Sequence, residues 1–175
     1  MKKLIGDERR TKLINWLKAS SQPLTGTELA NKANVSRQVI VQDISLLKAK
    51  DEPILATSNG YIYLEKTNTN NNFQQVFACN HTREQTKEEL YTIVDHGVTV
   101  KDVIIEHPIY GDLKAAVMVS SRAEVDQFLN KVKSTNAPYL LELTNGVHLH
   151  TVEADTKEKI DAAHNALKEL DIIIE

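Results

Sequence analysis

Residues 25–50 have the sequence TGTELANKANVSRQVIVQDISLLKAK, and this stretch decides how the first part of the chain folds. Thr25, with Glu28 three residues later, has the pattern of a capping box and predicts the start of a helix. A corner follows at residues 34–35, and Ser36 is a typical cap for a second helix. That second helix has apolar side chains at helical spacing, at Val39, Ile40, Ile44 and Leu47. The stretch therefore predicts two helices joined by a tight turn.

Polar side chains lie between these apolar positions at the front of the second helix, namely Ser36, Arg37, Gln38 and Gln42. In a helix-turn-helix, the second helix directs such side chains to base edges in the major groove of double-stranded DNA. Arg can bond guanine, and Gln can bond adenine, through two hydrogen bonds. Lys48, near the end of the same helix, is suited to phosphate contact. We therefore expect these residues to bind DNA, although a helical hairpin with a polar outer face would show the same periodicity.

A hairpin signal after the two helices separates these alternatives. Residues 54–64, ILATSNGYIYL, hold two short apolar runs around Asn59 and Gly60, a pair that tolerates the backbone angles of a tight turn. Residues 7–19 precede the helix pair and predict an amphipathic helix. Helix, helix-turn-helix and hairpin, in this order, are the elements of a winged helix. The sequence therefore predicts that residues 1–64 form a DNA-binding domain.

Charge is divided unevenly along the chain. Residues 1–66 hold 11 Lys and Arg against 7 Asp and Glu, whereas residues 67–175 hold 10 against 17. A basic first part and an acidic remainder suit a DNA-binding domain joined to a domain of another kind.

The single cysteine, Cys79, excludes an internal disulfide and fits a reducing compartment. No signal segment or membrane-spanning apolar run is visible, so we expect a cytoplasmic protein with no membrane partner.

Residues 65–72, EKTNTNNN, are polar without an apolar anchor and predict a linker between two domains. Over residues 73–175 the hydrophobic pattern alternates between strand and helix periods. It predicts a strand, a helix, two strands, a helix, an Asn-Gly hairpin over residues 139–153 and a last helix, with a short strand at residues 172–174. This order describes an α+β domain with helices on one face of a largely antiparallel sheet.

The histidines of the chain all lie in this second domain, and some have the spacing of metal ligands. His148 and His150 are separated by one residue on a predicted strand, so their side chains project from the same face. His81 lies where the first strand gives way to a helix, and Glu89 lies about two turns into that helix. Three imidazoles and one carboxylate would suit Zn, Ni, Fe, Co or Mn. By spacing alone, however, ordinary surface histidines are the commoner explanation.

His107 ends a predicted strand just before Pro108 and Tyr110. It is suited to three roles: an additional metal ligand, a group that orients a ligand, or a hydrogen-bond partner for a bound small molecule. A strand-end histidine that bonds only backbone is the fourth reading. The residues alone leave these readings open.

Together, these segments resemble the niacin-responsive transcriptional repressors of bacteria, which join a winged helix to a C-terminal three-histidine (3H) domain. The resemblance covers essentially the whole chain. It rests on the segment at 35–47, on His81 with Glu89, on VIIEHPIYGDL at 103–113 and on NGVHLH at 145–150. The histidine segments in this order are more specific than the helix-turn-helix, which many regulators share.

The resemblance implies both a function and a site. It implies a homodimeric repressor that binds operators of niacin uptake and NAD synthesis genes, with nicotinic acid as co-repressor. It implies that residues 73–175 form an HPr-like α+β regulatory domain, in which a divalent metal is held by His81, Glu89, His148 and His150. It implies that the effector lies near the histidine segment at 103–113, so His107 and Tyr110 are candidate effector contacts. Arg83, just after His81, is a further candidate for binding the effector carboxylate, although an exposed surface arginine is the commoner explanation.

Other functions fit parts of this pattern. A metal-responsive repressor would use the same cation site without an organic effector. An enzyme with a fused DNA-binding domain, such as a biotin ligase, would need a longer chain, and the sequence has no glycine-rich phosphate loop and no nucleophile beside a base. A toxin–antitoxin or other partner-binding module would use the acidic domain as a contact surface. We therefore expect a non-enzymatic repressor, with the metal-responsive form as the alternative.

Overall fold

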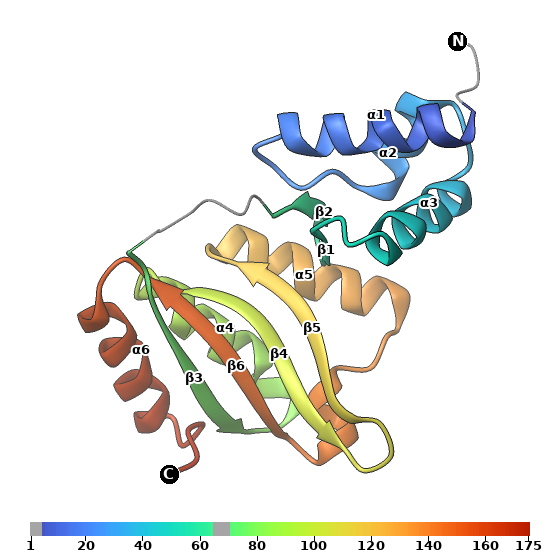
Figure 1. Cartoon of the computed structure of the whole chain (residues 1–175). Coiled ribbons are helices and arrows are strands. Elements are labelled where there is room, and N and C mark those ends of the chain that lie inside the picture. The colour runs from blue at the N-terminus through green and yellow to red at the C-terminus, as the bar shows by residue number, and fades with distance from the viewer. Residues whose placement is uncertain (1–4, 65–70) are drawn as a thin grey trace. The chain divides into compact units, whose positions relative to one another are not determined.

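The computed structural model of the chain describes residues 5–64 and 71–175 (Figure 1). The chain divides after residue 69 into two compact units, each with its own hydrophobic core. Residues 65–70 of the expected linker 65–72 lie outside the described residues, so the linker stays a prediction. None of the helices in the described ranges combines the length and the apolar character that a membrane span requires.

The N-terminal unit contains three helices followed by a hairpin: α1 (Gly6–Ala19), α2 (Gly26–Ala33), α3 (Arg37–Ala49), β1 (Ile54–Thr57) and β2 (Gly60–Tyr63). The Thr25 hydroxyl accepts a hydrogen bond from the Glu28 N–H at 3.2 Å, and the Glu28 carboxylate accepts one from the Thr25 N–H. The Ser36 hydroxyl accepts one from the Val39 N–H at 3.4 Å. Asn34 ends α2 in the left-handed conformation, which turns the chain into α3. The helix-turn-helix prediction is confirmed.

The hairpin after α3 is the wing of the winged helix. It is extended by the segment before α2, which is hydrogen-bonded to β2. β1 pairs antiparallel with β2, and Leu24 exchanges two backbone hydrogen bonds with Tyr61, at 2.8 and 3.0 Å. Gly60 has a φ of +128°, and a Cβ at this position would lie 2.6 Å from the Leu24 carbonyl. Any other residue would push the Leu24 segment away from β2. The predicted hairpin at Asn59 and Gly60 is confirmed, and this close approach explains its glycine.

One carboxylate is buried in the helical core of this unit. Asp43 of α3 accepts hydrogen bonds from Arg9 Nη2 at 3.2 Å and from Arg10 Nη1 at 3.1 Å. Because a buried charge is stable only with partners, these pairs fix α1 against α3. The surrounding core consists of apolar side chains from all three helices and from β1: Leu13, Leu17, Leu29, Ala30, Ala33, Ile40, Ile44, Leu47 and Ile54.

The C-terminal unit is a four-stranded antiparallel sheet in the order β3-β6-β4-β5, with its helices on one face (Figure 1). The sequence of elements, β-α-β-β-α-β-α, agrees with the HPr-like α+β domain that the resemblance implies. The elements are β3 (Phe73–Asn80), the 3-10 helix η1 (Arg83–Gln85), α4 (Thr86–Asp95), β4 (Thr99–His107), β5 (Gly111–Val119), α5 (Arg122–Thr135), the 3-10 helix η2 (Leu140–Thr144), β6 (Val147–Ala154) and α6 (Lys157–Glu169).

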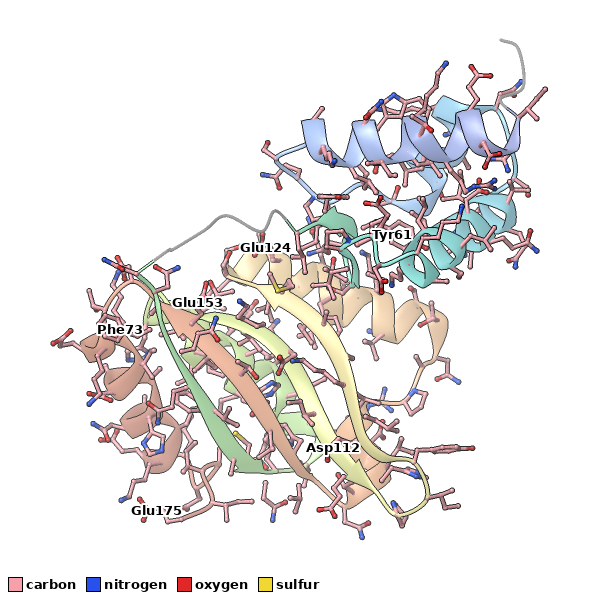
Figure 2. All side chains as sticks on the ribbon, viewed as in Figure 1. Tyr61, Phe73, Asp112, Glu124, Glu153 and Glu175 are labelled. Atoms are coloured by element: carbon pink, nitrogen blue, oxygen red, sulfur yellow. The ribbon has the colours of Figure 1, made fainter. Side chains whose placement is uncertain are left out.

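Alternation along β6 decides which of its side chains face the helices. Its even-numbered residues are buried, and its odd-numbered residues are half-buried or exposed. The register of β3 against β6 sets Cys79 opposite His148 on the helix-covered face, and His150 follows on the same face. Glu153 lies on the other face, where Lys101 pairs with it at 3.1 Å (Figure 2). Both strand histidines therefore point into the core of the unit.

The predicted hairpin over residues 139–153 is wrong. Residues 140–144 form η2, and only β6 is a strand. β6 is hydrogen-bonded to β3 on one side and to β4 on the other, so it has no free edge for a preceding hairpin partner. Asn145 is the left-handed cap of η2 rather than part of a hairpin turn. At the C-terminus, the expected strand at residues 172–174 is reduced to a single bridge to β3.

Candidate functional site

Four residues that are distant in the sequence meet between the sheet and α4. His81 follows β3, Glu89 lies in α4, and His148 and His150 project from the same face of β6. All four are buried, with exposed fractions between 1 % and 6 %. The structure thus brings together the four residues that were expected to bind a metal.

The Glu89 carboxylate is the centre of this cluster. His81 Nε2 lies 2.7 Å from one of its oxygens, and His148 Nε2 lies 3.0 Å from the other. His150 Nε2 is buried 3.3 Å from the first oxygen, and within residues 5–64 and 71–175 no atom meets the geometry of a hydrogen bond with it. Two ligand atoms held at right angles about 2.1 Å from one ion lie roughly 3.0 Å apart. Each of these Nε2–oxygen separations is therefore close to the distance between two ligand atoms of one cation, and the ligand atoms of Cys79, Glu89 and His148 all lie within 4.8 Å of one another.

Each imidazole is oriented by a hydrogen bond at its other nitrogen. In all three histidines Nδ1–H donates to a backbone carbonyl at 2.7 Å; for His81, His148 and His150 in turn, the acceptors belong to Thr82, Gly146 and Asp102. Such a hydrogen bond fixes the ring and its tautomer, and it is typical of histidines that bind metals. When an imidazole is neutral, its Nε2 therefore has a lone pair that points toward Glu89; when it is protonated, Nε2–H can donate to the Glu89 carboxylate, as the contacts of His81 and His148 require.

This arrangement requires positive charge at its centre. If all three imidazoles are neutral, three lone pairs and a carboxylate face one another in a site closed to water. If all three are protonated, a net charge of about +2 is buried, which is costly. One or two protons would lower this charge and account for the contacts of His81 and His148, but among the described residues His150 Nε2 would still have no hydrogen-bond partner. A divalent cation bound to neutral imidazoles leaves a net charge of about +1 and gives His150 Nε2 a partner. The cluster therefore fits a divalent cation that accepts imidazole and carboxylate ligands.

The same contacts shift pKa values in the protein without metal. Burial would raise the pKa of Glu89, but the charge of His150 and the histidine hydrogen bonds hold it well below its usual value. Burial would lower the pKa of His81 and the pKa of His150, but contact with the Glu89 carboxylate raises both. Glu89 is therefore ionised and supplies the negative charge that a bound cation requires.

Cys79 borders the cluster from β3. Its sulfur lies within 4.8 Å of ligand atoms of Glu89 and His148, and these three residues form a group that could hold a cation. Burial raises the pKa of the Cys79 thiol, and the nearby Glu89 carboxylate raises it further. Cys79 is therefore a protonated thiol in the protein without metal, and it contributes to the wall of the site.

The residues expected to contact DNA lie at the surface of α3 and its cap, and all are exposed: Ser36, Arg37, Gln38, Gln42 and Lys48. Gln38 and Gln42 are one helical turn apart, on the side of α3 opposite its buried residues. The stem of Arg37 passes close to Gly26 at the start of α2, since a Cβ on Gly26 would lie 3.4 Å from Arg37 Cγ. α3 thus presents a polar surface of the kind that enters a major groove.

Comparison with known proteins matches both units to domain families. Residues 74–175 match the 3H domain, and residues 9–62 match an HTH domain. The transcription repressor NadR of Bacillus subtilis is 58 % identical over 173 residues, which cover 98 % of this chain and 96 % of that protein. The chain belongs to the 3H-domain transcription repressors.

A second relative supports the same family. The probable transcription repressor NiaR of Thermotoga maritima is 38 % identical over 173 residues, which cover 99 % of this chain and 97 % of that protein. As a 3H-domain transcription repressor, the chain binds operator DNA through its HTH domain. The buried cluster of histidines and Glu89 lies within its 3H domain.

The candidate effector contacts of this 3H-domain repressor lie in two places. His107 ends β4, and its Nδ1 accepts backbone N–H bonds from Ile109 at 3.2 Å and from Tyr110 at 3.3 Å. Its ring lies against the Tyr110 ring at 5.0 Å. These described contacts belong to the β4–β5 hairpin itself, and the tautomer is opposite to that of the cluster histidines. Arg83, by contrast, lies in η1, two residues after His81.

Two residues that support the cluster of this repressor were not expected from the sequence. Gly146 has a φ of +100°, and its carbonyl accepts hydrogen bonds from the Nδ1–H of His148 and from the backbone N–H of His81. Asp102 orients His150 through its own carbonyl. The Asn-Gly pair at residues 145–146 signals a special backbone conformation, but a backbone acceptor such as Asp102 leaves no signal in the sequence.

Proposed function

We propose that this chain represses niacin uptake and NAD synthesis genes, with nicotinic acid as its co-repressor. The effector is sensed in the 3H domain, at a divalent metal held by His81, Glu89, His148 and His150. One observation carries this proposal: three buried imidazole Nε2 atoms surround a single carboxylate. The relatives are named as transcription repressors, which favours a regulatory role over a catalytic one.

The ligand set accounts for the type of effector. When bound, a divalent metal supplies a positive centre that attracts a ligand carboxylate or ring nitrogen. The histidines and Glu89 hold that centre, and the carbonyls behind the imidazoles keep each Nε2 aimed at it. Zn, Ni, Fe, Co and Mn all accept such ligands, so the ligand set alone does not select among them.

On the DNA side, we assign base contacts to Arg37, Gln38 and Gln42, supported by Ser36 and Lys48. The exposure of all five side chains supports this assignment. In a homodimer, the two α3 helices would meet half-sites about 34 Å apart, or a multiple of this distance. As a co-repressor, nicotinic acid binds the DNA-competent arrangement more tightly than the other, and a typical coupling is about 1–3 kcal/mol.

Operator affinity tests this proposal directly. Protein loaded with one metal is titrated with labelled operator at fixed salt, with and without nicotinic acid, and again after chelation. We expect nicotinic acid to raise operator affinity about 5-fold or more, because that is the low end of typical coupling. Chelation should abolish the effect, and His148→Ala should behave like the chelated protein. Equal affinity in every condition would exclude the co-repressor role.

A metal-responsive repressor without an organic effector is the second candidate, because the same cluster would serve it. In that case metal alone gives full operator affinity, and nicotinic acid adds nothing. A thermal-unfolding titration with nicotinic acid at constant metal separates the two functions. Only a protein that binds nicotinic acid in its folded state shows a rise in unfolding temperature with ligand concentration.

A further inference from the structure

We propose that a pocket beside the metal cluster binds the carboxylate effector. The pocket has a volume of about 410 Å³ and lies between two turns, at residues 80–85 and 141–146. Ligand pockets measure about 300–1,000 Å³, so this one suits a single aromatic ring with one carboxylate. The assignment rests on the proposed function, which supplies the effector, and it adds the place where that effector binds.

The pocket shares a wall with the metal cluster. His81 lines the pocket through its backbone, while its fully buried imidazole is part of the cluster. Gly146, on the facing turn, joins the two: its carbonyl accepts the Nδ1–H of His148 at 2.7 Å and the backbone N–H of His81 at 3.4 Å. A Cβ on Gly146 would lie only 2.5 Å from the His81 carbonyl oxygen, so the turns are in direct contact. A ligand that moves either turn therefore changes the direction in which the Nε2 atoms of His81 and His148 point.

Arg83 provides the positive charge at the rim of the pocket. Its guanidinium lies over the Tyr139 ring at 5.2 Å and 3.5 Å from a Glu142 oxygen, and the Arg83 side chain is 45 % exposed. A half-exposed ion pair of this length contributes little to stability. A ligand carboxylate can therefore replace Glu142 as the partner of Arg83 and accept two N–H bonds from it. Glu142 stays in place, because its other oxygen accepts the Tyr139 N–H at 2.6 Å.

Amides and one apolar side chain complete the lining. Asn80, Gln85 and Asn145 offer N–H and carbonyl groups, and Leu141 offers an apolar surface. This set suits a small aromatic acid whose carboxylate meets Arg83, whose ring lies beside Leu141 and whose ring nitrogen accepts an amide N–H. Because the cluster side chains are buried, an effector in this position would act on the metal site through the two turns rather than by direct contact with the metal. A neutral amide of the same shape lacks the charge-assisted contact with Arg83.

The tip of the β4–β5 hairpin is less suited to this role. Ile109 is 80 % exposed and Tyr110 is 74 % exposed. Small-molecule sites bury most of the ligand surface, and these two side chains offer less enclosure than Arg83, which is 45 % exposed and lines the pocket. Of the three candidate effector contacts, Arg83 is therefore the one that we assign to the pocket.

Binding of nicotinic acid to Arg83 variants tests the assignment. Calorimetry on the metal-loaded full chain compares wild type with Arg83→Gln, with Glu142→Gln and with the control Arg122→Gln. Arg122 is a matched control because it is also exposed, pairs with Asp95 and lies over an aromatic ring, that of Tyr91, at 4.3 Å. We expect Arg83→Gln to weaken nicotinic acid binding by about 10-fold or more. In Arg83→Gln, the ratio of the affinity for nicotinic acid to the affinity for nicotinamide should fall by a similar factor.

The other two variants should behave differently. Glu142→Gln removes the carboxylate that competes for Arg83, while its amide oxygen can still accept the Tyr139 N–H. We expect it to bind nicotinic acid about 3-fold more tightly, because the competing charge is gone. Arg122→Gln should bind as wild type does. Metal content and unfolding temperature are measured for each variant to show that it folds and binds metal. If Arg83→Gln does not fold, the affinity of Glu142→Gln for nicotinic acid still tests the pocket.

The possible outcomes distinguish the pocket from the function on which it rests. If wild type binds nicotinic acid and both pocket variants bind it equally well, the pocket assignment is wrong and the proposed function stands. If metal-loaded wild type binds no nicotinic acid, the proposed function fails and the pocket assignment fails with it. Weaker nicotinic acid binding in Arg83→Gln together with tighter binding in Glu142→Gln would support both the pocket assignment and the proposed function.

Discussion

His81 Nε2 lies 2.7 Å from the Glu89 carboxylate, although the two residues are eight apart and His81 lies in the turn after β3 whereas Glu89 lies in α4. η1 and the first turn of α4 bring them together. The Thr82 N–H donates to Gln85 Oε1 at 3.2 Å and fixes the start of this segment. The turn between β3 and α4 therefore assembles half of the cluster locally, and β6 adds the other two imidazoles through sheet pairing.

Replacing His148 by Ala removes a nitrogen that faces Glu89. We expect the affinity for a divalent metal to fall by about 100-fold or more, since even the supporting partners of ligands contribute about 10–100-fold. Isothermal titration of chelator-treated protein measures this change. His164→Ala is the control, because His164 lies on α6 with its ring 5.3 Å from that of Phe77. Unchanged metal affinity in His148→Ala would remove this residue from the site.

Without metal, the cluster should make stability depend on pH in a defined direction. The pKa of His81 and the pKa of His150 are raised above the ordinary 6.5, so their stabilisation is complete below that value and is lost as the pH rises through the folded pKa values. The pKa of Glu89 is held below the ordinary 4.5, so its stabilisation is present above that value and is lost at lower pH. The stabilisation by the cluster is therefore largest between these two ordinary values.

We expect the chelated protein to be less stable near pH 8 than near pH 6, and metal to reverse this order because it binds neutral imidazoles. Urea unfolding followed by circular dichroism, with chelator and with metal at both pH values, checks this expectation. A chelated protein that gains stability toward pH 8 would show that the cluster does not control the unfolding of the 3H domain.

Gly146→Ala should disturb the cluster through the backbone. A methyl group there meets the His81 carbonyl and the Asn80 side chain, at 2.5 and 2.7 Å, in a conformation with positive φ. Gly111→Ala is the matched control, since Gly111 also has positive φ but has no atom within 4 Å of the added Cβ. We expect Gly146→Ala to lower the free energy of unfolding by about 1–3 kcal/mol more than the control does, and to reduce metal content. Equal effects of the two substitutions in urea unfolding would exclude the steric explanation.

Local signals predicted the secondary structure best. The caps at Thr25 and Ser36 act within three residues, so one sequence is enough to predict α2 and α3. The hairpin at residues 139–153 failed for the opposite reason. Whether Asn145 ends a 3-10 helix or turns a hairpin depends on which strands flank β6, and that is decided by distant parts of the chain.

In the candidate site, too, local features could be predicted from the sequence, and features that depend on tertiary packing could not. Strand alternation predicted that His148 and His150 share a face, but their approach to Glu89 depends on packing between β6 and α4. Asp43 interrupts an apolar helical stripe, which is a usable sign of a buried ion pair. Its partners on α1, Arg9 and Arg10, follow only from the tertiary fold.

Asp43→Asn should weaken the attachment of α1 to α3. Charge-assisted hydrogen bonds contribute about 1.5–3 kcal/mol, so we expect the free energy of unfolding of the N-terminal unit to fall by about 2 kcal/mol. The single tryptophan, Trp16, lies in α1 and reports the unfolding of this unit by fluorescence. Asp7→Asn is the control, since Asp7 also pairs with Arg10 but its side chain is 92 % exposed. If Asp7→Asn costs as much as Asp43→Asn, burial is not what makes the pair important.

Base and phosphate contacts on α3 should differ in their salt dependence. We expect Gln42→Ala to weaken operator binding by about 1–3 kcal/mol and to leave non-specific binding unchanged, because a base contact carries sequence information. Lys48→Ala should weaken binding to every sequence alike and lower the slope of log affinity against log salt by about 1. Fluorescence anisotropy on operator and scrambled DNA over a salt series separates these effects, with Lys157→Ala in the 3H domain as control. A salt slope changed by Gln42→Ala but not by Lys48→Ala would reverse the roles of these two residues.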